Sequence, residues 1–404
     1  MKMITTEILN KTSENNCSLI LTISHTLTIN NSPTVISFLY RAYLDYNNIK
    51  LNLNKLALPP SLQPSLEKIG KRESIEFFCS HGKIVFEKID VVGCCNGLVL
   101  ISSGLHNVGI SNPANECFKV IPSINYPGFY SENHGQGYKT NYETPPFYRI
   151  YYRKYVYRYF KFRVFGFGYD CNSQCYKIVY LTPLKAHIYC LKKDCHSWRR
   201  IDLPEFKSSS GFIQQGNSEK GLYIKAYNHG VFTNNHIHWN ITKNDPLVFE
   251  YSKEKILGFD LCKEEWGEVP VPEVLNRGYF LQGYMLKPYL LEVGVLNGSL
   301  CILLSRGISY PHLELWIMKK YAVKESWMKL CNVPNGSGIP LAYYIEQDEY
   351  LLPGKEHGLG WYNPQKNRVN KVEFHGCEFT GEHYYSTGAK MCIESFADPF
   401  TSIE

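Results

Sequence analysis

The sequence predicts an all-β fold whose strands form a closed, β-propeller-like sheet, preceded by a short, partly helical N-terminal segment. Two observations lead to this prediction. The first is an aromatic fraction of 14%, with 31 Tyr and 21 Phe, because these side chains fit half-buried pleated surfaces better than helices. The second is a loose repeat of hairpin patterns, described below. The chain has 404 residues, 44% hydrophobic and 20% charged, so it can bury a full core, and wholesale disorder and coiled coil are excluded.

Residues 1–78 differ in character from the rest of the chain. The segment TVISFLYRAYLDYNNIKLNL (34–53) has apolar residues at helical spacing, which predicts a short helix. The segment LPPSLQPSLEKIGKRES (58–74) is rich in Pro, Ser and charge, and we expect it to be an exposed connector. The propeller-like domain is therefore expected over residues 79–395, followed by a C-terminal tail over 396–404.

The repeat consists of an alternating apolar run, a polar turn, usually an aromatic residue, and a second alternating run that usually ends near Pro. Alternation with a period of two on both sides of a polar turn is typical of a β-hairpin. The repeat occurs in VGISNPANECFKVIPS (108–123), IYCLKKDCHSWRRIDLP (188–204), ILGFDLCKEEWGEVPVP (256–272), LELWIMKKYAVKESWMKLCNVP (313–334) and GLGWYNPQKNRVNKVEF (358–374). In three of these units the aromatic residue is a tryptophan, and we expect equivalent, buried core positions in successive blades for Trp198, Trp266 and Trp327.

Further hairpins are expected between these units. Three segments centre on a turn-forming Asn, and a fourth has DCNSQC as its turn: CCNGLVLIS (94–102), HGVFTNNHIHWNI (229–241), VGVLNGSLCILLS (293–305) and VFGFGYDCNSQCYKIVYL (164–181). Asn-Gly and Asn-Asn pairs tolerate the positive φ that tight hairpin turns require. Two hairpins per unit give the four strands of a propeller blade. A pair of β-sandwiches would produce a similar pattern and is the alternative arrangement.

The chain contains 14 Cys, whose spacing shows no disulfide framework. Residues 1–30 lack the apolar run and small-residue cleavage site of an export signal, and no apolar stretch reaches the roughly 18 residues that cross a bilayer. We therefore expect an intracellular protein, cytoplasmic or nuclear, with reduced thiols and no membrane partner. The net charge of +6 is too small for a chain of this length to name a partner.

Sequence motifs for catalysis or phosphate binding are absent, among them GxxxxGK[ST], HExxH, GxSxG and a GxGxxG that follows a strand. The two glycines of FGFGYD (165–170) are interpreted as strand glycines packed beneath aromatic residues. His236 and His238 lie on one face of an expected strand, without a third metal ligand at a telling distance. We predict no catalytic and no cofactor-binding residues.

Two groups of residues look superficially like zinc ligands. They are Cys171 with Cys175, and Cys190 with Cys195 and His196. Neither has CxxC spacing, and both lie at expected hairpin turns, where Cys as a small buried residue is ordinary. We predict no metal-binding residues.

The segment PPFYRIYYRKYVYRYFKFR (145–163) alternates aromatic and basic residues. Such a pattern can stack on bases and neutralise phosphates, but a strand with Tyr on one face and Arg or Lys on the other is the simpler interpretation, and no nucleic-acid partner is expected. Tyr and Arg are enriched at the energetically dominant positions of protein–protein interfaces. We therefore expect partner-binding residues at Tyr151, Tyr152, Arg153, Tyr155, Tyr157 and Arg158.

Eight short segments together resemble the F-box-associated, kelch-like propeller domain of plant F-box proteins, including the S-locus F-box-like group. In family order they are GCCNGLVLIS (93–102), SNPANECFKVIP (111–122), FGFGYDCNSQCYKIVYL (165–181), IYCLKKDCHSWRRID (188–202), GVFTNNHIHW (230–239), ILGFDLCKEEWGEVPVP (256–272), LELWIMKKYAVKESWMKL (313–330) and GLGWYNPQKNRV (358–369). The resemblance implies a substrate-recognition module of an SCF (cullin-type) ubiquitin ligase. Its implied partners are a target protein and, through an F-box, the adaptor and cullin subunits.

The N-terminal residues depart from this family. Family members begin with an F-box, a helical segment that opens near Leu-Pro and ends with a Trp-containing turn. Residues 1–33 show neither feature: the first Trp is Trp198, and SLILTISHTLTI is β-rich. TVISFLYRAY (34–43) resembles the sequence just after an F-box. We therefore expect a degenerate or missing F-box, a truncated or decoy receptor, and no adaptor binding.

The leading interpretation is thus a non-enzymatic protein-recognition module that binds targets for ubiquitination. A propeller-fold enzyme, either a kelch-type oxidase or a glycosidase, is the alternative. Kelch units carry Gly-Gly doublets, and this sequence has none. A glycosidase needs two carboxylates on either side of a cleft, which a single sequence does not reveal.

Overall fold

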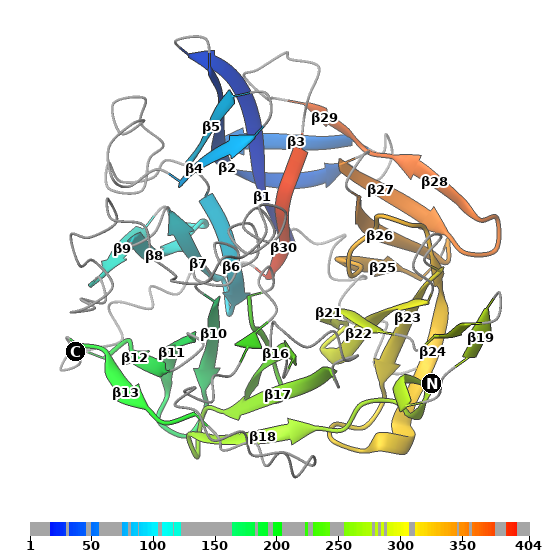
Figure 1. Ribbon diagram of the computed structural model, residues 1–404. Helices are drawn as coiled ribbons and strands as arrows, with labels where there is room; N and C mark the ends of the chain where they lie inside the picture. Colours follow the sequence, from blue (N-terminus) through cyan, green and yellow to red (C-terminus); the bar gives the residue numbers. More distant parts are fainter. Residues whose placement is uncertain are drawn as a thin grey trace, which may run out of the picture.

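The computed structural model of the chain describes residues 17–29, 32–45, 50–55, 75–79, 82–87, 89–103, 107–115, 117–122, 164–181, 185–192, 197–203, 223–224, 229–242, 254–276, 279–281, 284–286, 289–306, 312–345, 347–354, 358–375 and 385–393. Strands make up most of these residues, with two short 3-10 helices among them, η3 (Glu273–Asn276) and η4 (Lys324–Ser326). The sheets are arranged as a ring (Figure 1). The predicted all-β, propeller-like fold is confirmed.

Five sheets form the blades of the ring, and their antiparallel strands follow one another in chain order. Blade 1 consists of β6 (Ile89–Cys95), β7 (Leu98–Ser103), β8 (Asn107–Asn112) and β9 (Cys117–Ile121). Blade 2 consists of β10 (Val164–Asp170), β11 (Cys175–Leu181), β12 (Ala186–Cys190) and β13 (Arg199–Ile201). In blade 3 both β14 (Tyr223–Ile224) and β15 (Val231–Thr233) pair with β16 (His236–Thr242), which is followed by β17 (Glu254–Asp260) and β18 (Glu265–Val269).

The remaining blades have the same four-stranded order. Blade 4 consists of β21 (Tyr289–Leu296), β22 (Ser299–Arg306), β23 (His312–Met318) and β24 (Trp327–Val333). Blade 5 consists of β25 (Ala342–Tyr344), β26 (Glu349–Gly354), β27 (Gly358–Asn363) and β28 (Arg368–Lys371). Between blades 3 and 4 the chain forms the hairpin of β19 (Tyr279–Leu281) and β20 (Tyr284–Leu286).

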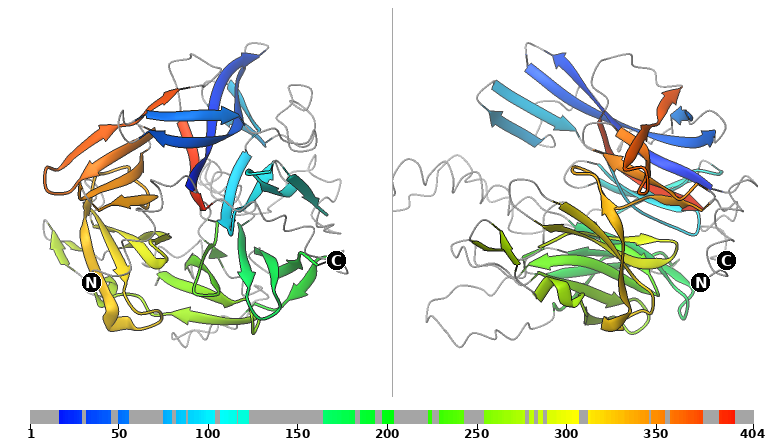
Figure 2. Two further views of the ribbon diagram at one scale, coloured as in Figure 1. Left: turned by 180° about the vertical axis from the view of Figure 1, so that it is seen from behind. Right: turned by 90° about the vertical axis from the view of Figure 1, so that its right-hand side faces the viewer.

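A further sheet, here called the closing sheet, combines strands from both ends of the chain (Figures 1 and 2). It contains β1 (Cys17–Ile29), β2 (Ser32–Asp45), β3 (Lys50–Lys55), β4 (Ile75–Cys79), β5 (Gly82–Glu87), β29 (Glu373–His375) and β30 (Tyr385–Ile393). Strand β1 pairs antiparallel with both β2 and β30, so Ile20 stands opposite Arg41 on one side and Lys390 on the other. The first and last described strands of the chain thereby close the ring.

The prediction of a short helix in the segment 34–53 is wrong, because the described residues of this segment form strands. Residues 34–45 belong to β2, and residues 50–53 belong to β3, its antiparallel partner. The segment is rich in β-branched and aromatic residues, which favour strands, and pairing with β1 and β3 gives its backbone partners on both sides. The domain boundary predicted at residue 79 remains a prediction. Strands from both sides of residue 79 share the closing sheet.

The hydrophobic core lies between neighbouring sheets. Each cluster of buried side chains draws on two adjacent members of the ring, as in Leu100 with Phe167 (blades 1 and 2), Val179 with Trp239 (blades 2 and 3), Ile256 with Leu300 (blades 3 and 4), and Leu303 with Leu352 (blades 4 and 5). Ile20 of the closing sheet shares a cluster with Val91 and Val99 of blade 1. Each blade therefore depends on its neighbours for burial, as repeat architectures do.

Two glycines of β10 show how closely the blades approach. A Cβ on Gly166 would lie 2.3 Å from Cγ2 of Ile237, and a Cβ on Gly168 would lie 2.3 Å from Cδ2 of Phe232. Only glycine leaves room for blade 3 to press on this strand. This confirms the interpretation of the FGFGYD glycines as packing residues.

The predicted tight turns are also confirmed. Asn96-Gly97, Asn234-Asn235 and Asn297-Gly298 each have positive φ at both residues, between 48° and 82°. These values belong to type I′ turns, whose twist matches that of the flanking strands.

Candidate functional site

Hairpin turns of three neighbouring blades meet at one end of the ring, and hydrogen bonds connect them. We call this surface the turn face and define it by residues 170–175, 233–236, 260–265, 296–299 and 319–326. The hydroxyl of Thr233 donates to the carbonyl of Gly298 at 2.5 Å and so links blades 3 and 4. The N–H of Leu261 donates to the carbonyl of Asn235 at 3.1 Å and links the two turns of blade 3. The turns therefore brace one another.

The turn face offers mainly polar side chains to solvent. Its exposed residues in blades 2 and 3 are Cys171, Asn172, Gln174, Asn234, Lys263 and Glu265. Hydrogen-bonding groups and charges of both signs are thus presented on a fixed backbone. Such a surface suits recognition of a polar macromolecular surface better than enclosure of a small apolar ligand.

An Asp or Asn side chain shapes several of the hairpin turns. Asp170, Asp260 and Asn363 each accept hydrogen bonds from the backbone N–H groups two and three residues further on, at 2.8 to 3.3 Å. Asn112 accepts one such bond. A short side-chain acceptor at the first turn position imitates a backbone turn, which is why the repeat recurs as DCNSQC, DLCKEE, NPANEC and NPQKNR.

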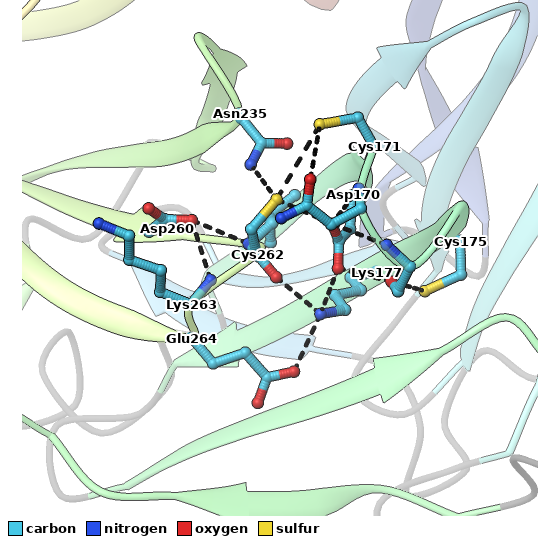
Figure 3. A network of polar contacts seen from close by, with 12 residues as sticks. Asp170, Cys171, Cys175, Lys177, Asn235, Asp260, Cys262, Lys263 and Glu264 are labelled. Atoms are coloured by element: carbon cyan, nitrogen blue, oxygen red, sulfur yellow. Dashed lines mark hydrogen bonds and ion pairs between the residues drawn. The ribbon is translucent and has the colours of Figure 1, made fainter.

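A buried lysine connects blades 2 and 3 beneath the turn face (Figure 3). Lys177 of β11 is 4% exposed, and its Nζ donates to the carbonyl of Leu261 at 2.6 Å and to Oδ2 of Asp170 at 2.8 Å. The third partner is Oε1 of Glu264 at 2.9 Å, and Oε2 of Glu264 accepts from Arg199 at 2.5 Å. The three donors of the ammonium group thus meet three acceptors.

The charges in this network hold one another in the ionised state. Burial acts to raise the pKa of Asp170, but hydrogen bonds from Cys262 and Lys177 outweigh burial and hold that pKa well below its usual range. Burial acts to lower the pKa of Lys177, but Asp170 and Glu264 raise it. Burial likewise acts to raise the pKa of Glu264, whereas Arg199 and Lys177 lower it. These groups stabilise an ion-pair network and are poorly suited to exchange protons near neutral pH.

Two thiols lie at the edge of the same network (Figure 3). The Sγ of Cys262 donates to Oδ1 of Asp170 at 2.9 Å and accepts from Nδ2 of Asn235 at 2.7 Å. The Sγ of Cys171 lies 4.0 Å from the Sγ of Cys262. Burial, and then the bond to Asp170, raise the pKa of the Cys262 thiol, so this sulfur carries its proton and is a poor nucleophile.

The two histidines that the sequence places on one strand face have other partners. His238 is 0% exposed; its Nδ1 lies 3.2 Å from the carbonyl of Val231 and its Nε2 lies 2.8 Å from the hydroxyl of Tyr321. Because a carbonyl only accepts, Nδ1 carries the proton and Nε2 accepts from Tyr321. The ring of His236 contacts the rings of both His238 and Tyr321. The arrangement ties blade 3 to blade 4.

Comparison with known proteins identifies the family. A family model described as the F-box associated beta propeller domain matches residues 43–377. The chain belongs to the F-box-associated β-propeller family. The resemblance seen in the sequence is thereby confirmed.

Several Arabidopsis thaliana proteins are similar to this family member. F-box protein CPR1 is 26% identical over 312 residues, which cover 71% of this chain and 64% of CPR1. F-box/kelch-repeat protein At3g23880 is 24% identical over 206 residues, which cover 51% of this chain and 50% of the relative. The chain therefore spans less than two thirds of the length of these relatives.

Solved structures that are similar to this F-box-associated propeller are distant. An oligogalacturonate lyase in complex with manganese has a TM-score of 0.37 and 8% identity, covering 90% of this chain and 87% of the lyase. The propeller domain of the Trilobed protease from Pyrococcus furiosus has a TM-score of 0.33 and 7% identity, covering 89% of this chain and 98% of that domain. Likenesses at this level say nothing about function.

The three repeat tryptophans occupy corresponding places in the F-box-associated propeller. Each donates its indole N–H to the carbonyl of the residue directly after the outermost strand of the preceding blade: Trp198 to Pro122 at 2.7 Å, Trp266 to Asp202 at 2.8 Å, and Trp327 to Pro270 at 2.7 Å. Trp327 is buried, whereas Trp198 and Trp266 are only partly buried. We call these contacts the tryptophan latches. They join the outer edges of blades 1 to 4.

Other residues predicted from the sequence are placed as follows. Cys171 and Cys175 flank the β10–β11 turn as expected, and the Sγ of Cys171 lies close to that of Cys262 in blade 3. Three of the described cysteines are buried: Cys95, Cys175 and Cys301. Cys195 and His196 lie outside the described residues. The six predicted partner-binding residues also lie outside them, namely Tyr151, Tyr152, Arg153, Tyr155, Tyr157 and Arg158.

Sequence reasoning did not find the network around Lys177. One signal was available, since a lysine in the otherwise apolar or aromatic strand CYKIVYL (175–181) needs a buried counter-charge. Its partner Glu264 is 87 residues away in the chain, so local patterns do not reveal it.

None of the helices in the described part of the family member is long and apolar enough to cross a membrane.

Proposed function

We propose that this chain is the target-recognition module of an SCF-type, cullin-based ubiquitin ligase receptor, and that it holds a target protein on the turn face. Family membership and the F-box proteins among its relatives support the proposal. One observation supports the turn face as the target-binding surface: turns from three blades are fixed to one another by cross-blade hydrogen bonds. Such turns lose little conformational entropy when a partner binds, which favours affinity.

The proposed role is binding without chemistry. In the described part of the turn face the charged groups of the Lys177 network are already paired, and the Cys262 thiol is hydrogen-bonded to Asp170. General acid–base or nucleophilic catalysis needs a group whose pKa or hydrogen bonds leave it ready to react. No observation on the described residues favours the alternative of a propeller-fold oxidase or glycosidase.

The other subunits of the ligase and the cellular compartment of the chain are also part of the proposed function. Adaptor and cullin subunits would join through an F-box, and residues 17–29 and 32–45 are strands of the closing sheet here. This segment therefore does not present the helical surface that an F-box offers. The cytoplasm or the nucleus is the proposed compartment, because ubiquitin ligases act there and because Cys171 and Cys262, with sulfurs 4.0 Å apart, form no disulfide.

Affinity capture with variants tests the proposal. The tagged chain, expressed in plant tissue, is compared with Asn172→Arg and Lys263→Glu, which alter exposed turn-face residues, and with Lys371→Glu, an exposed control at the end of β28. Proteins identified by mass spectrometry are then titrated with the purified chain. We expect a target whose affinity falls about tenfold or more in a turn-face variant and stays unchanged in the control. A target insensitive to both turn-face variants would place recognition elsewhere.

A further inference from the structure

Two hairpin turns from adjacent blades bring together a carboxylate and two thiols. Asp170 and Cys171 belong to the β10–β11 turn of blade 2, and Cys262 belongs to the β17–β18 turn of blade 3. The ligand atoms of these three residues all lie within 4.8 Å of one another. The two sulfurs are 4.0 Å apart although the cysteines are 91 residues apart in the chain. Local spacing in the sequence therefore does not reveal this group.

The donor set selects the class of metal. Thiolate sulfur with one carboxylate oxygen suits a borderline-soft ion such as Zn²⁺, whereas Mg²⁺ and Ca²⁺ prefer oxygen ligands throughout. Tetrahedral zinc with Zn–S bonds of about 2.3 Å separates two thiolate sulfurs by about 3.8 Å. The observed separation of 4.0 Å differs from this by a few tenths of an ångström.

The surroundings already hold two of these ligands, Asp170 and Cys262, in place. The carboxylate of Asp170 is oriented by the N–H groups of Asn172 and Ser173, at 2.9 and 3.3 Å, and by the hydroxyl of Ser173 at 2.5 Å. Asn235 donates to the Sγ of Cys262 at 2.7 Å. Hydrogen bonds of this kind around metal ligands fix their orientation and raise affinity.

We propose that Asp170, Cys171 and Cys262 bind one zinc ion, with a water molecule as the fourth ligand. The thiol hydrogen of Cys262 now points at Oδ1 of Asp170, 2.9 Å from its sulfur, and the ion takes its place. Each thiol releases one proton to solvent as it binds the metal. Cys171 is exposed, so the ion and its water reach the site from solvent.

The charges balance at such a site. Two thiolates and one carboxylate carry three negative charges against two positive charges on zinc. Lys177, whose Nζ is 2.8 Å from Oδ2 of Asp170, supplies the remaining positive charge. Zinc therefore connects the turns of blades 2 and 3 at the turn face without leaving a buried charge uncompensated.

Cobalt titration tests the zinc proposal directly. The purified 404-residue chain is stripped with a chelator under reducing conditions and titrated with Co²⁺, which reports thiolate ligands through sulfur-to-cobalt absorption in the near ultraviolet. We expect one Co²⁺ per chain, displaced by one Zn²⁺. Cys171→Ser and Cys262→Ser should each weaken binding about tenfold or more. Cys117→Ser, a partly buried cysteine that ends the corresponding turn of blade 1, should leave it unchanged.

Two further measurements check the folding of the variants and the identity of the zinc ligands. Circular dichroism checks that each variant is folded. The Cys171→Ser substitution changes an exposed turn residue and should leave the Lys177 network intact. Alkylation followed by peptide mapping should show that zinc protects Cys171 and Cys262 in the wild-type chain, and that a chelator restores their labelling. Absence of saturable binding, binding that survives both serine variants, or a Cys171–Cys262 disulfide in place of chelator-reversible protection would overturn the zinc proposal.

Discussion

The ammonium nitrogen of Lys177 lies 2.9 Å from Oε1 of Glu264, so a buried lysine of blade 2 forms an ion pair with a glutamate of blade 3. Both residues also bind other groups of the seam between the blades, namely Asp170, the carbonyl of Leu261 and Arg199. The seam is thus held by charges as well as by the apolar cluster around Val179 and Trp239.

Lys177→Met should destabilise the fold by about 3–5 kcal/mol, because it leaves the buried carboxylate of Asp170 without its counter-charge. Urea unfolding measures the change. Lys255→Met is the matched control, since its ion pair with Glu268 lies on the surface, and its loss should cost less than about 1 kcal/mol. Equal effects of the two substitutions would mean that the buried network contributes no more than a surface pair.

Trp266→Ala should destabilise the fold by about 3 kcal/mol, the lower end of the range for large aromatic side chains, because Trp266 is only partly buried. Trp266→Phe keeps most of the apolar contact with Phe259 and removes the bond to the carbonyl of Asp202. It should cost about 1 kcal/mol. Thermal unfolding compares the two variants, and no difference between them would argue against a contribution from the latch.

Gly166→Ala should destabilise the fold by about 1–3 kcal/mol, as overpacking does, because its Cβ would meet Ile237 at 2.3 Å and Trp239 at 2.7 Å. Gly267→Ala is the control: it also lies in a strand, but nothing is within 4 Å of its Cβ position. That substitution should be neutral or slightly stabilising, since alanine restricts the unfolded chain. A similar loss in both variants would show that strand glycines matter for a reason other than blade contact.

His238 should make stability fall as the pH is lowered. Burial lowers the pKa of His238 from 6.5 to about 3, against the opposing bond to Val231, and the neighbouring His236 adds a smaller lowering effect. The unfolded chain therefore binds more protons than the folded chain between these two values. The contribution of His238 is fully present above pH 6.5 and is lost as the pH falls from 6.5 toward 3.

At about 1.4 kcal/mol per pH unit below pH 6.5, His238 accounts for a loss of about 2 kcal/mol between pH 7 and pH 5. His238→Gln should lack this part of the pH dependence while keeping that of other groups. The measurement is the free energy of unfolding of both proteins at the two pH values. An identical fall in wild type and variant would show that the buried imidazole is not the group responsible.

The 404-residue chain is expected not to bind the SCF adaptor at micromolar concentrations. Residues 17–29 and 32–45 pair as strands β1 and β2 and do not supply an amphipathic helical surface for the adaptor. Calorimetric titration of adaptor into the chain checks this. An F-box grafted before residue 17 should restore adaptor binding and leave target binding unchanged, whereas saturable binding to the unmodified chain would contradict the expectation.

The sequence was informative where structure depends on neighbouring residues. Asn234-Asn235 and the two Asn-Gly pairs specify their turns through positive φ, and alternation specifies the strands that follow. The segment from residue 34 was mistaken for a helix because β2 owes its conformation to β1 and β3, on either side of it. The contacts of Lys177 with Glu264, and of Cys171 with Cys262, join turns of different blades. Such contacts follow from the arrangement of blades and not from local spacing.

The closing sheet sets the order of events while the protein is being made. Blades 1 to 5 are built from strands close together in the sequence, so each can form soon after it leaves the ribosome. Strand β1, in contrast, waits for β30, which follows all five blades in the chain. Until then one edge of β1 stays unpaired and available to other chains. The ring therefore closes only after β30 has been synthesised, and a chain that lacks the residues from Tyr385 onward keeps an open edge on β1.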